Sequence, residues 1–205
     1  VPAVRQLIET RWQAQVIDHC GATEIGPWGF GWPDRLGLHI IETSFIAELI
    51  PLGPPGMHEL ILTSLGRYGA PVLRYRTGDV VNAERPLSGD CRFLWLPQGV
   101  IGRADDMVTI RGVNIFPSSL DAIVREFPAI SEYRACVTRR EHLDELELEI
   151  EVLVGQEASV QALFEKLLTS RLGLRIPVRL APTGSLPRSE GKSNRWQDRR
   201  ASNAL

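Results

Sequence analysis

A strict alternation of apolar and acidic residues in the second half of the chain restricts its fold more than any other feature. The segment ELELEIEVLVG at 145–155 alternates Leu146, Leu148, Ile150 and Val152 with Glu147, Glu149 and Glu151. A period of two places successive side chains on opposite faces of a strand, which a helix cannot reproduce. We therefore expect a sheet with one buried face, and we interpret the glutamates as its solvated face rather than as an acidic site.

The neighbouring segments extend this strand into a domain. A helix is predicted to start at Pro117 and to continue through LDAIVREF at 120–127, where apolar residues recur at helical spacing. A strand is predicted at 133–140, an amphipathic helix over 159–173 ending at Gly173, and a last strand at 176–182 followed by a basic tail. The order α-β-β-α-β predicts a compact α+β domain. Just before it, 106–116 is predicted to form two short strands around Gly112.

The chain before Gly102 has a different character. Segments rich in Ile, Leu and Val at 36–50, 58–65, 71–81 and 92–96 are separated by clusters of Gly and Pro, which is typical of strands joined by turns. This unit is predicted to be mostly β, without a strong helix. We place the domain boundary near Ala104 to Asp106, giving domains at 1–104 and 105–205, and the fold class as α+β.

Composition excludes several classes of protein. Hydrophobic residues make up 43% and charged residues 23% of the 205 residues, as in folded globular proteins. The formal net charge of −2 gives no support for nucleic-acid or membrane-surface binding, and no apolar run reaches the roughly 18 residues of a membrane helix. The N-terminus lacks the pattern of a secretory signal. Three scattered cysteines indicate neither a disulfide framework nor a zinc site, and we expect a reducing, cytoplasmic setting.

Two segments of the first unit carry residues suited to bind a nucleotide. In GATEIGP at 21–27, the Thr23 hydroxyl can donate to a phosphate oxygen and Glu24 can hold a hard cation, although such a segment is also typical of a helix N-terminus. In YRTGD at 75–79, the two oxygens of Asp79 can accept from a vicinal diol such as ribose. The alternative is a strand that ends in a turn with Asp79 as a local cap.

Two further segments follow. In GRADDMVTIRGVNIFP at 102–117, Arg103 can reach a phosphate or an adenylate, and Asp105 lies at the predicted domain boundary, where a hinge residue would lie. Gly112 leaves room for a narrow group to approach the backbone. In LPRSEGKSNRW at 186–196, Lys192 lies on a polar loop and can deliver a positive charge to a phosphate or carboxylate oxygen. The alternative is a solvated basic tail.

Together and in this order, the four segments resemble the adenylate-forming enzyme superfamily, and in detail its phenylacetate-CoA ligase branch, from about Asp18 to about Arg200. The resemblance implies an AMP-forming ligase. A small carboxylic acid, aryl or acyl, attacks the α-phosphate of ATP and forms an acyl-adenylate. The small C-terminal domain then rotates, and the thiol of coenzyme A (CoA) displaces AMP. By this resemblance, 1–104 is the β-rich end of the large AMP-binding domain and 105–205 is a mobile lid.

The resemblance also implies a role for each residue singled out above. The implied contacts are Thr23 with the α-phosphate, Glu24 with Mg²⁺, Asp79 with the ribose hydroxyls, Arg103 with the nucleotide, Lys192 with the substrate carboxylate and phosphate, and Gly112 with the pantetheine channel, while Asp105 is the hinge.

Two of the departures from the pattern of this branch bear on nucleotide binding and activity. Cys20 stands where the branch usually has a tyrosine that stacks on adenine, and a thiol offers much less stacking area. The Gly-rich phosphate loop and the acyl pocket are expected upstream of Val1. We therefore expect the C-terminal half of an enzyme that needs an N-terminal segment or chain, and that does not adenylate alone. Two alternatives remain, namely transfer to another acceptor such as a carrier-protein thiol, and a non-catalytic module that binds a nucleotide or a partner.

Overall fold

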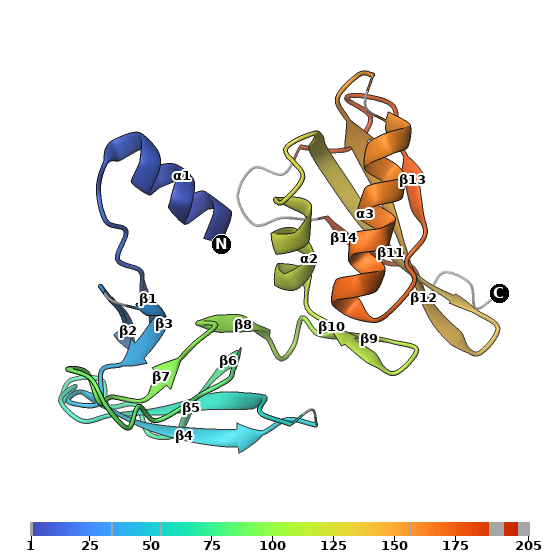
Figure 1. Cartoon of the computed structure of the whole chain (residues 1–205). Helices are drawn as coiled ribbons and strands as arrows, with labels where there is room; N and C mark the ends of the chain where they lie inside the picture. The colour runs from blue at the N-terminus through green and yellow to red at the C-terminus, as the bar shows by residue number, and fades with distance from the viewer. Residues whose placement is uncertain (1, 34, 54, 156, 189–194, 201–205) are drawn as a thin grey trace. The chain divides into compact units, whose positions relative to one another are not determined.

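The chain forms two separate hydrophobic cores, one in each of two units that span Val1–Asp106 and Met107–Leu205. The computed structural model in Figure 1 describes residues 2–33, 35–53, 55–155, 157–188 and 195–200. Among the described residues strands outnumber helices, and both units are mixed, so the α+β fold class is confirmed.

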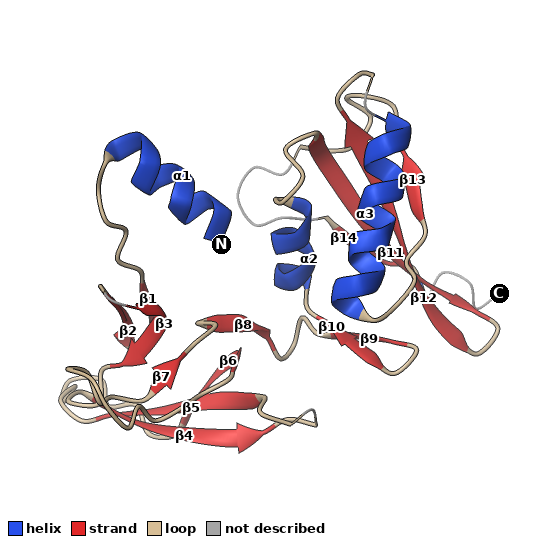
Figure 2. Ribbon diagram, viewed as in Figure 1, coloured by secondary structure: helices blue, strands red, loops and turns tan. Residues whose placement is uncertain are grey.

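The first unit contains two antiparallel sheets of four strands each (Figure 2). The sheet with the order β1-β2-β3-β7 consists of β1 (His19–Ala22), β2 (Gly26–Trp32), β3 (Arg35–Ile40) and β7 (Trp95–Leu96). The sheet with the order β4-β5-β6-β8 consists of β4 (Phe45–Pro51), β5 (His58–Ser64), β6 (Tyr75–Val81) and β8 (Val100–Arg103). The buried core includes Trp28 and Ile40 from the first sheet and Leu60 and Leu62 from the second.

Three details of this unit differ from expectation. The apolar run at 36–50 is broken by a turn at 42–44, so that its two halves, β3 and β4, belong to different sheets. The strand expected at 92–96 shrinks to Trp95–Leu96. A helix, α1 (Pro2–Trp12), precedes the first strand. Its apolar residues Val4, Leu7 and Ile8 recur at helical spacing but are 38%, 57% and 41% exposed, and they are not part of the buried core of this unit.

The second unit has the order predicted from the sequence. A hairpin of β9 (Val108–Ile110) and β10 (Val113–Ile115) precedes α2 (Pro117–Val124), β11 (Ile130–Arg140), β12 (Leu143–Val152), α3 (Glu157–Leu172) and β13 (Val178–Leu180). The sheet has the order β13-β12-β11-β14, with β11 and β12 antiparallel and the outer strands parallel to their neighbours. The outer strand β14 (Trp196–Asp198) lies in the segment expected to be a basic tail, so that expectation was wrong.

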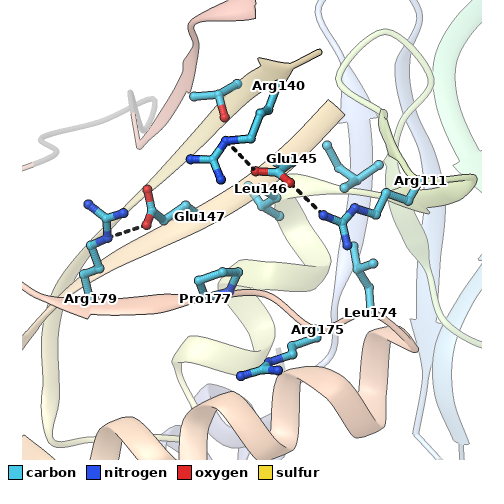
Figure 3. Close-up of a pocket in the computed structure, with 11 residues that line it drawn as sticks. Arg111, Arg140, Glu145, Leu146, Glu147, Leu174, Arg175, Pro177 and Arg179 are labelled. Carbon is cyan, nitrogen blue, oxygen red and sulfur yellow. Dashed lines mark hydrogen bonds and ion pairs between the residues drawn. The ribbon is translucent and has the colours of Figure 1, made fainter. Parts of the chain in front are cut away.

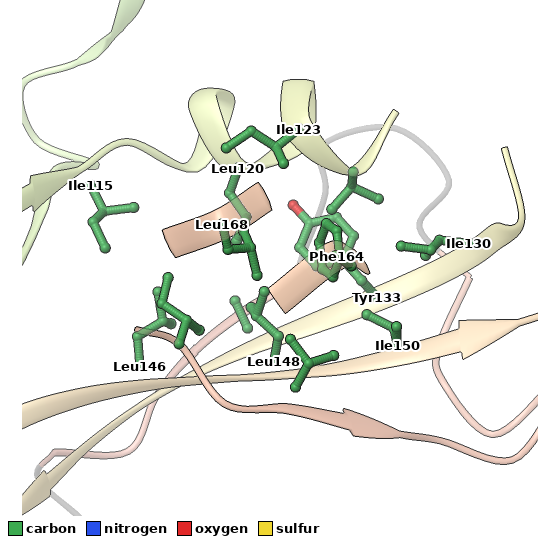
Figure 4. Close-up of a cluster of buried hydrophobic side chains, with 14 of the residues drawn as sticks. Ile115, Leu120, Ile123, Ile130, Tyr133, Leu146, Leu148, Ile150, Phe164 and Leu168 are labelled. Carbon is green, nitrogen blue, oxygen red and sulfur yellow. The ribbon is translucent and has the colours of Figure 1, made fainter. Parts of the chain in front are cut away.

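The two helices of this unit cover one face of the sheet (Figure 4). Leu146, Leu148 and Ile150, the apolar half of the alternating segment, are buried there against Phe164 and Leu168 of α3. The rings of Phe164 and Phe127 meet edge to face with their centroids 5.2 Å apart. The α3 helix ends at Leu172, and Gly173 follows with a positive φ of 67° and donates to the carbonyl of Thr169, as the sequence predicted.

On the opposite face of this sheet, one of the three glutamates that were predicted to be solvated is buried. Glu147 and Glu149 are partly exposed and pair with Arg179 and Arg134, as expected for a solvated face. Glu151, which was expected to be solvated with them, is fully buried. The backbone N–H of Leu186 and the guanidinium of Arg188 both bind its carboxylate. A buried carboxylate needs such partners, because burial without them would cost several kcal/mol.

Within the described part of the chain, no helix is both long and apolar enough to cross a bilayer. The three cysteines Cys20, Cys91 and Cys136 are free thiols.

Candidate functional site

Asp79 and Arg103 lie opposite each other on the neighbouring strands β6 and β8 of the first unit. The Thr77 hydroxyl donates to the carbonyl of Leu60 and accepts from the backbone N–H of Asp79, at 2.9 and 3.0 Å, which fixes the end of the YRTGD segment. Gly78 between them has a φ of +74°, and a Cβ there would lie 2.6 Å from Nη2 of Arg103. The glycine therefore allows both the backbone conformation and the close approach of the guanidinium.

One guanidinium holds two of the predicted site carboxylates. Arg103 Nε lies 2.9 Å from Oδ1 of Asp105, and its Nη2 donates to Oδ2 at 3.2 Å. Its Nη1 lies 3.8 Å from Oδ1 of Asp79 and donates to the carbonyl of Thr77 at 3.3 Å. The structure thus brings Asp79, Arg103 and Asp105 together.

The two carboxylates differ in their surroundings. The side chain of Asp79 is 18% exposed, and burial raises its pKa above the usual value even though Arg103 lowers it. Asp105 is 66% exposed, and its hydrogen bond with Arg103 holds its pKa below the usual value. Because burial removes competing water, Asp79 is the better placed of the two to accept hydrogen bonds from a ligand.

Thr23 and Glu24 lie in the turn between β1 and β2, and both are exposed. This turn, and not the start of a helix, is the local structure of the GATEIGP segment, so the alternative of a helix N-terminus is wrong. The turn is tied to the unit through its backbone, since Nη1 of Arg67 donates to the carbonyl of Glu24 at 2.8 Å. The Glu24 carboxylate itself is exposed and can act as a single carboxylate ligand of a cation. Among the described residues, no cluster of three or more His, Cys, Asp or Glu side chains offers a complete metal site.

Cys20 precedes this turn on β1 and is half-buried. Burial raises the pKa of its thiol to about 11, and the negative charge of Asp79 contributes to the rise. The thiol is therefore protonated at neutral pH and is a poor nucleophile.

Gly112 lies in the second unit, in the turn of the β9–β10 hairpin. Arg111 and Gly112 have φ values of +50° and +81° between the paired residues Ile110 and Val113. Two positive φ values in a two-residue connection are typical of a type I′ turn, which favours glycine at its second position. A Cβ at Gly112 would meet nothing within 4 Å, so the space beside it is open. Lys192, the remaining predicted site residue, lies outside the described residues.

A cavity of about 450 Å³ opens beside this hairpin (Figure 3). Four arginines and two glutamates line it, giving an excess of two positive charges, and these are Arg111, Arg140, Arg175, Arg179, Glu145 and Glu147. Arg111 Nη2 lies 2.7 Å from Oε1 of Glu145, and Arg179 pairs with Glu147. The arginines come from separate elements and form no motif. Only a knowledge of the strand pairing could have identified this cavity from the sequence.

A prediction follows from the contact between Gly78 and Arg103. Gly78→Ala places a side chain at positive φ and against the guanidinium, so we expect the free energy of unfolding to fall by about 1–2 kcal/mol. Gly66→Ala is the control, because a Cβ there meets nothing within 4 Å and its φ is not positive. Urea unfolding of the two variants checks this. Equal stability of both would show that Gly78 is not constrained as described.

Comparison with known proteins supports the sequence resemblance. Residues 112–200 match the AMP-binding enzyme C-terminal domain. Phenylacetate-coenzyme A ligase from Escherichia coli (strain K12) is 34% identical over 97% of this chain, and that from Pseudomonas putida is 32% identical over 96%. The chain covers 48% of each of them, so it spans about half the length of these curated relatives.

A solved structure shows the same fold. The structure of 2-hydroxyisobutyryl-CoA ligase in the postadenylation state, in complex with 2-HIB-AMP, superposes with a TM-score of 0.82 at 27% identity, covering 98% of this chain and 46% of that chain. The chain is therefore homologous to the C-terminal part of the phenylacetate-CoA ligases, and its residues 112–200 match the AMP-binding enzyme C-terminal domain.

Proposed function

We propose that this chain is the C-terminal part of an AMP-forming ligase that adenylates a small aryl or acyl acid with ATP and transfers the acyl group to CoA. The observation that carries the proposal is the Arg103 guanidinium held between Asp79 and Asp105, in a chain homologous to CoA ligases. This arrangement is suited to bind a nucleotide. The guanidinium of Arg103 can bind a phosphate, and the largely buried carboxylate of Asp79 can accept hydrogen bonds from the ribose hydroxyls.

The roles in adenylation follow from this arrangement. Asp79 accepts hydrogen bonds from the two ribose hydroxyls, and Arg103 contacts the nucleotide. Thr23 donates to the α-phosphate from the exposed β1–β2 turn, and Glu24 beside it would hold Mg²⁺. Mg²⁺ in phosphoryl-binding sites is usually held by one or two carboxylates together with substrate phosphates, so a single exposed glutamate fits this ion. Bound there, the ion would offset phosphate charge.

Lys192 bridges the substrate carboxylate and the α-phosphate. Its ammonium group offsets the negative charge that builds up as the carboxylate oxygen attacks phosphorus. A point charge on a long side chain is suited to a contact that is made in one half-reaction and withdrawn in the next.

Asp105 is the hinge between a large AMP-binding domain and a mobile lid. The backbone N–H of Ala104 donates to the carbonyl of Gly78 at 2.8 Å, so the chain is still tied to the sheet of the first unit at that residue. The second unit begins at Met107. Residues 105 and 106 connect the two units, and a hinge there would release the ion pair of Asp105 with Arg103 and the 3.3 Å bond from the N–H of Asp106 to the carbonyl of Arg103.

CoA is the acceptor that the charge of the second unit favours. The cavity beside Gly112 has an excess of positive charge, which suits the phosphates at the nucleotide end of CoA, and the open space at Gly112 suits the narrow pantetheine arm. A carrier-protein thiol remains the alternative acceptor. We place the reaction in the cytoplasm. Because the chain spans about half the length of its relatives, we infer that the phosphate loop and the acid pocket come from sequence equivalent to their first half.

The test is release of pyrophosphate from ATP across a panel of aryl and aliphatic acids. The protein assayed is the ligase that carries this chain, with its own upstream sequence or with the front half of the E. coli relative fused to it. One acid should drive release, and adding CoA should then yield AMP and the acyl-CoA. Transfer only to a phosphopantetheinylated carrier would support the alternative acceptor. No release with any acid would favour a non-catalytic module that binds a nucleotide or a partner.

A prediction concerns Cys20, the position where an aromatic ring would stack on adenine. Cys20→Tyr should tighten ATP binding roughly 2- to 10-fold, because one stacked ring contributes about 0.5–1.5 kcal/mol. Cys20→Ala is the control, since it removes the thiol without adding a ring. Isothermal titration of ATP into the same ligase measures both. No gain with tyrosine would place adenine away from Cys20.

A further inference from the structure

Two glutamates lie directly opposite each other in the four-stranded sheet of the second unit, on the face that the helices do not cover. Glu132 on β11 and Glu151 on β12 are paired in the strand register, next to the core pair Tyr133 and Ile150 on the other face. Glu132 is 5% exposed and Glu151 is fully buried. Two buried carboxylates side by side repel each other, so both require strong partners.

The partners of Glu151 come from the chain just before the segment 189–194. Its Oε1 accepts from the backbone N–H of Leu186 at 2.6 Å, and its Oε2 accepts from Nη2 of Arg188 at 2.8 Å. Burial raises the pKa of Glu151, but these hydrogen bonds and the charge of Arg188 hold it below its usual value. The carboxylate is therefore charged at neutral pH and fixes Arg188 on the sheet.

The partner of Glu132 comes from the chain just after the same segment. Its two oxygens accept from Nε and Nη2 of Arg195 at 2.5 and 3.1 Å, a two-pronged pair, and the backbone N–H of Tyr133 adds a third bond at 2.9 Å. The guanidinium of Arg195 also lies over the Tyr133 ring, 5.4 Å from its centroid. The backbone is held as well, because the carbonyl of Arg195 accepts from the N–H of Ala135 at 2.8 Å.

Stability alone does not account for this arrangement. Replacing a buried ion pair by apolar residues of similar volume is often neutral or stabilising, so a buried pair is weak evidence for a role in stability. What a buried, hydrogen-bonded pair does supply is fixed geometry, since its donors and acceptors fit in one orientation. Here the two pairs fix Arg188 and Arg195, the residues on either side of 189–194. The two glutamates that bind these arginines occupy opposite positions on the adjacent strands β11 and β12. The Cα atoms of such opposite residues lie about 5 Å apart in antiparallel pairs.

We propose that Glu132 and Glu151 are positioning residues that hold the two ends of the segment carrying Lys192 and thereby set the reach of its ammonium group for adenylation. The inference rests on the proposed function, in which Lys192 serves adenylation and not thioester formation. Lys192 is four residues from Arg188 and three from Arg195, so a shift of either end is passed to it through a short length of chain. A misplacement of about 1 Å in a catalytic group can cost roughly 10²-fold in rate.

The experiment measures the two half-reactions separately in the ligase that carries this chain. Glu132→Gln and Glu151→Gln remove the charge and keep the shape, and each should lower the kcat for pyrophosphate release by roughly 10- to 100-fold. Thioester formation from CoA and a presynthesised acyl-adenylate should stay within about twofold of the wild type. Glu149→Gln is the matched control, because Glu149 lies on the same strand and face but pairs with Arg134, away from 189–194. It should leave both rates unchanged.

The opposite results are equally specific. Parallel loss of both half-reactions together with a lower melting temperature would mean that the two glutamates act only on stability, and unchanged rates would mean that they do not act at all. If the glutamine variants do not fold, Arg188→Gln gives the same test, since that side chain is half exposed. Arg188→Lys should then restore part of the adenylation rate, and equal rates for lysine and glutamine would overturn the inference. The wild-type rate tests the proposed function, whereas the ratio of the two half-reactions tests this inference.

Discussion

Lys192→Ala should reduce pyrophosphate release by roughly 10²- to 10³-fold, which is the usual cost of removing one group that stabilises the charge of a transition state. The effect should fall on kcat more than on the KM for ATP, because the ammonium group meets its full complement of negative charge only as the acid attacks phosphorus. Thioester formation from a presynthesised acyl-adenylate should be nearly unchanged. Pyrophosphate release and CoA-dependent release of AMP, measured separately, check the two halves of this prediction.

The chain offers a matched control, because Lys166 is its one other lysine. Lys166 is exposed on α3 and is assigned no role, so Lys166→Ala should retain wild-type rates in both half-reactions. An equal loss of both half-reactions in Lys192→Ala would contradict the assignment of this lysine to adenylation. A loss in Lys166→Ala of similar size would indicate a general effect of lysine removal on folding or solubility.

Phe164→Ala should destabilise the second unit by about 3–5 kcal/mol, which is typical for truncating a fully buried aromatic side chain. Phe164 packs between α3 and the sheet and meets Phe127 edge to face, so its removal leaves a cavity and also breaks an aromatic pair. Hydrogen exchange resolved to peptides is the measurement. Protection should fall throughout 107–200 and remain unchanged in 1–106, because the two cores share no residue.

Leu163→Ala is the control for this substitution. Leu163 is the adjacent residue of the same helix and is 60% exposed, so its truncation should change the free energy of unfolding by less than about 0.5 kcal/mol. If Phe164→Ala lowered protection equally in both units, the two cores would unfold as one, and the division of the chain at 106 would have no thermodynamic meaning.

Local patterns predicted the elements of the second unit well. The alternation at 146–152 predicted β12, and the helical spacing closed by Gly173 predicted α3 with its end. Both signals come from residues close in sequence, whose preferences survive packing. The order of elements, and with it the α+β fold, followed from such signals alone.

Local sequence patterns could not predict which distant segments pair with each other. The burial of Glu151 depends on Arg188, 37 residues away in a segment that resembles a solvated tail. The pairing of Asp79 with Arg103 depends on the register of β6 with β8, which lie on either side of a long connection. The candidate site residues were therefore found by motif, and their contacts were not, because a motif records residue types whereas contacts depend on register.

The short strand β14 has a consequence for the association of this protein with itself. It pairs with three residues of β11, Ala135, Cys136 and Val137, and so occupies the middle of the outer edge of an eleven-residue strand. An uncovered strand of that length presents a row of free N–H and C=O groups to which a strand of another molecule can add. By pairing with β11, the strand β14 covers part of this edge and so disfavours the addition of a strand from another molecule.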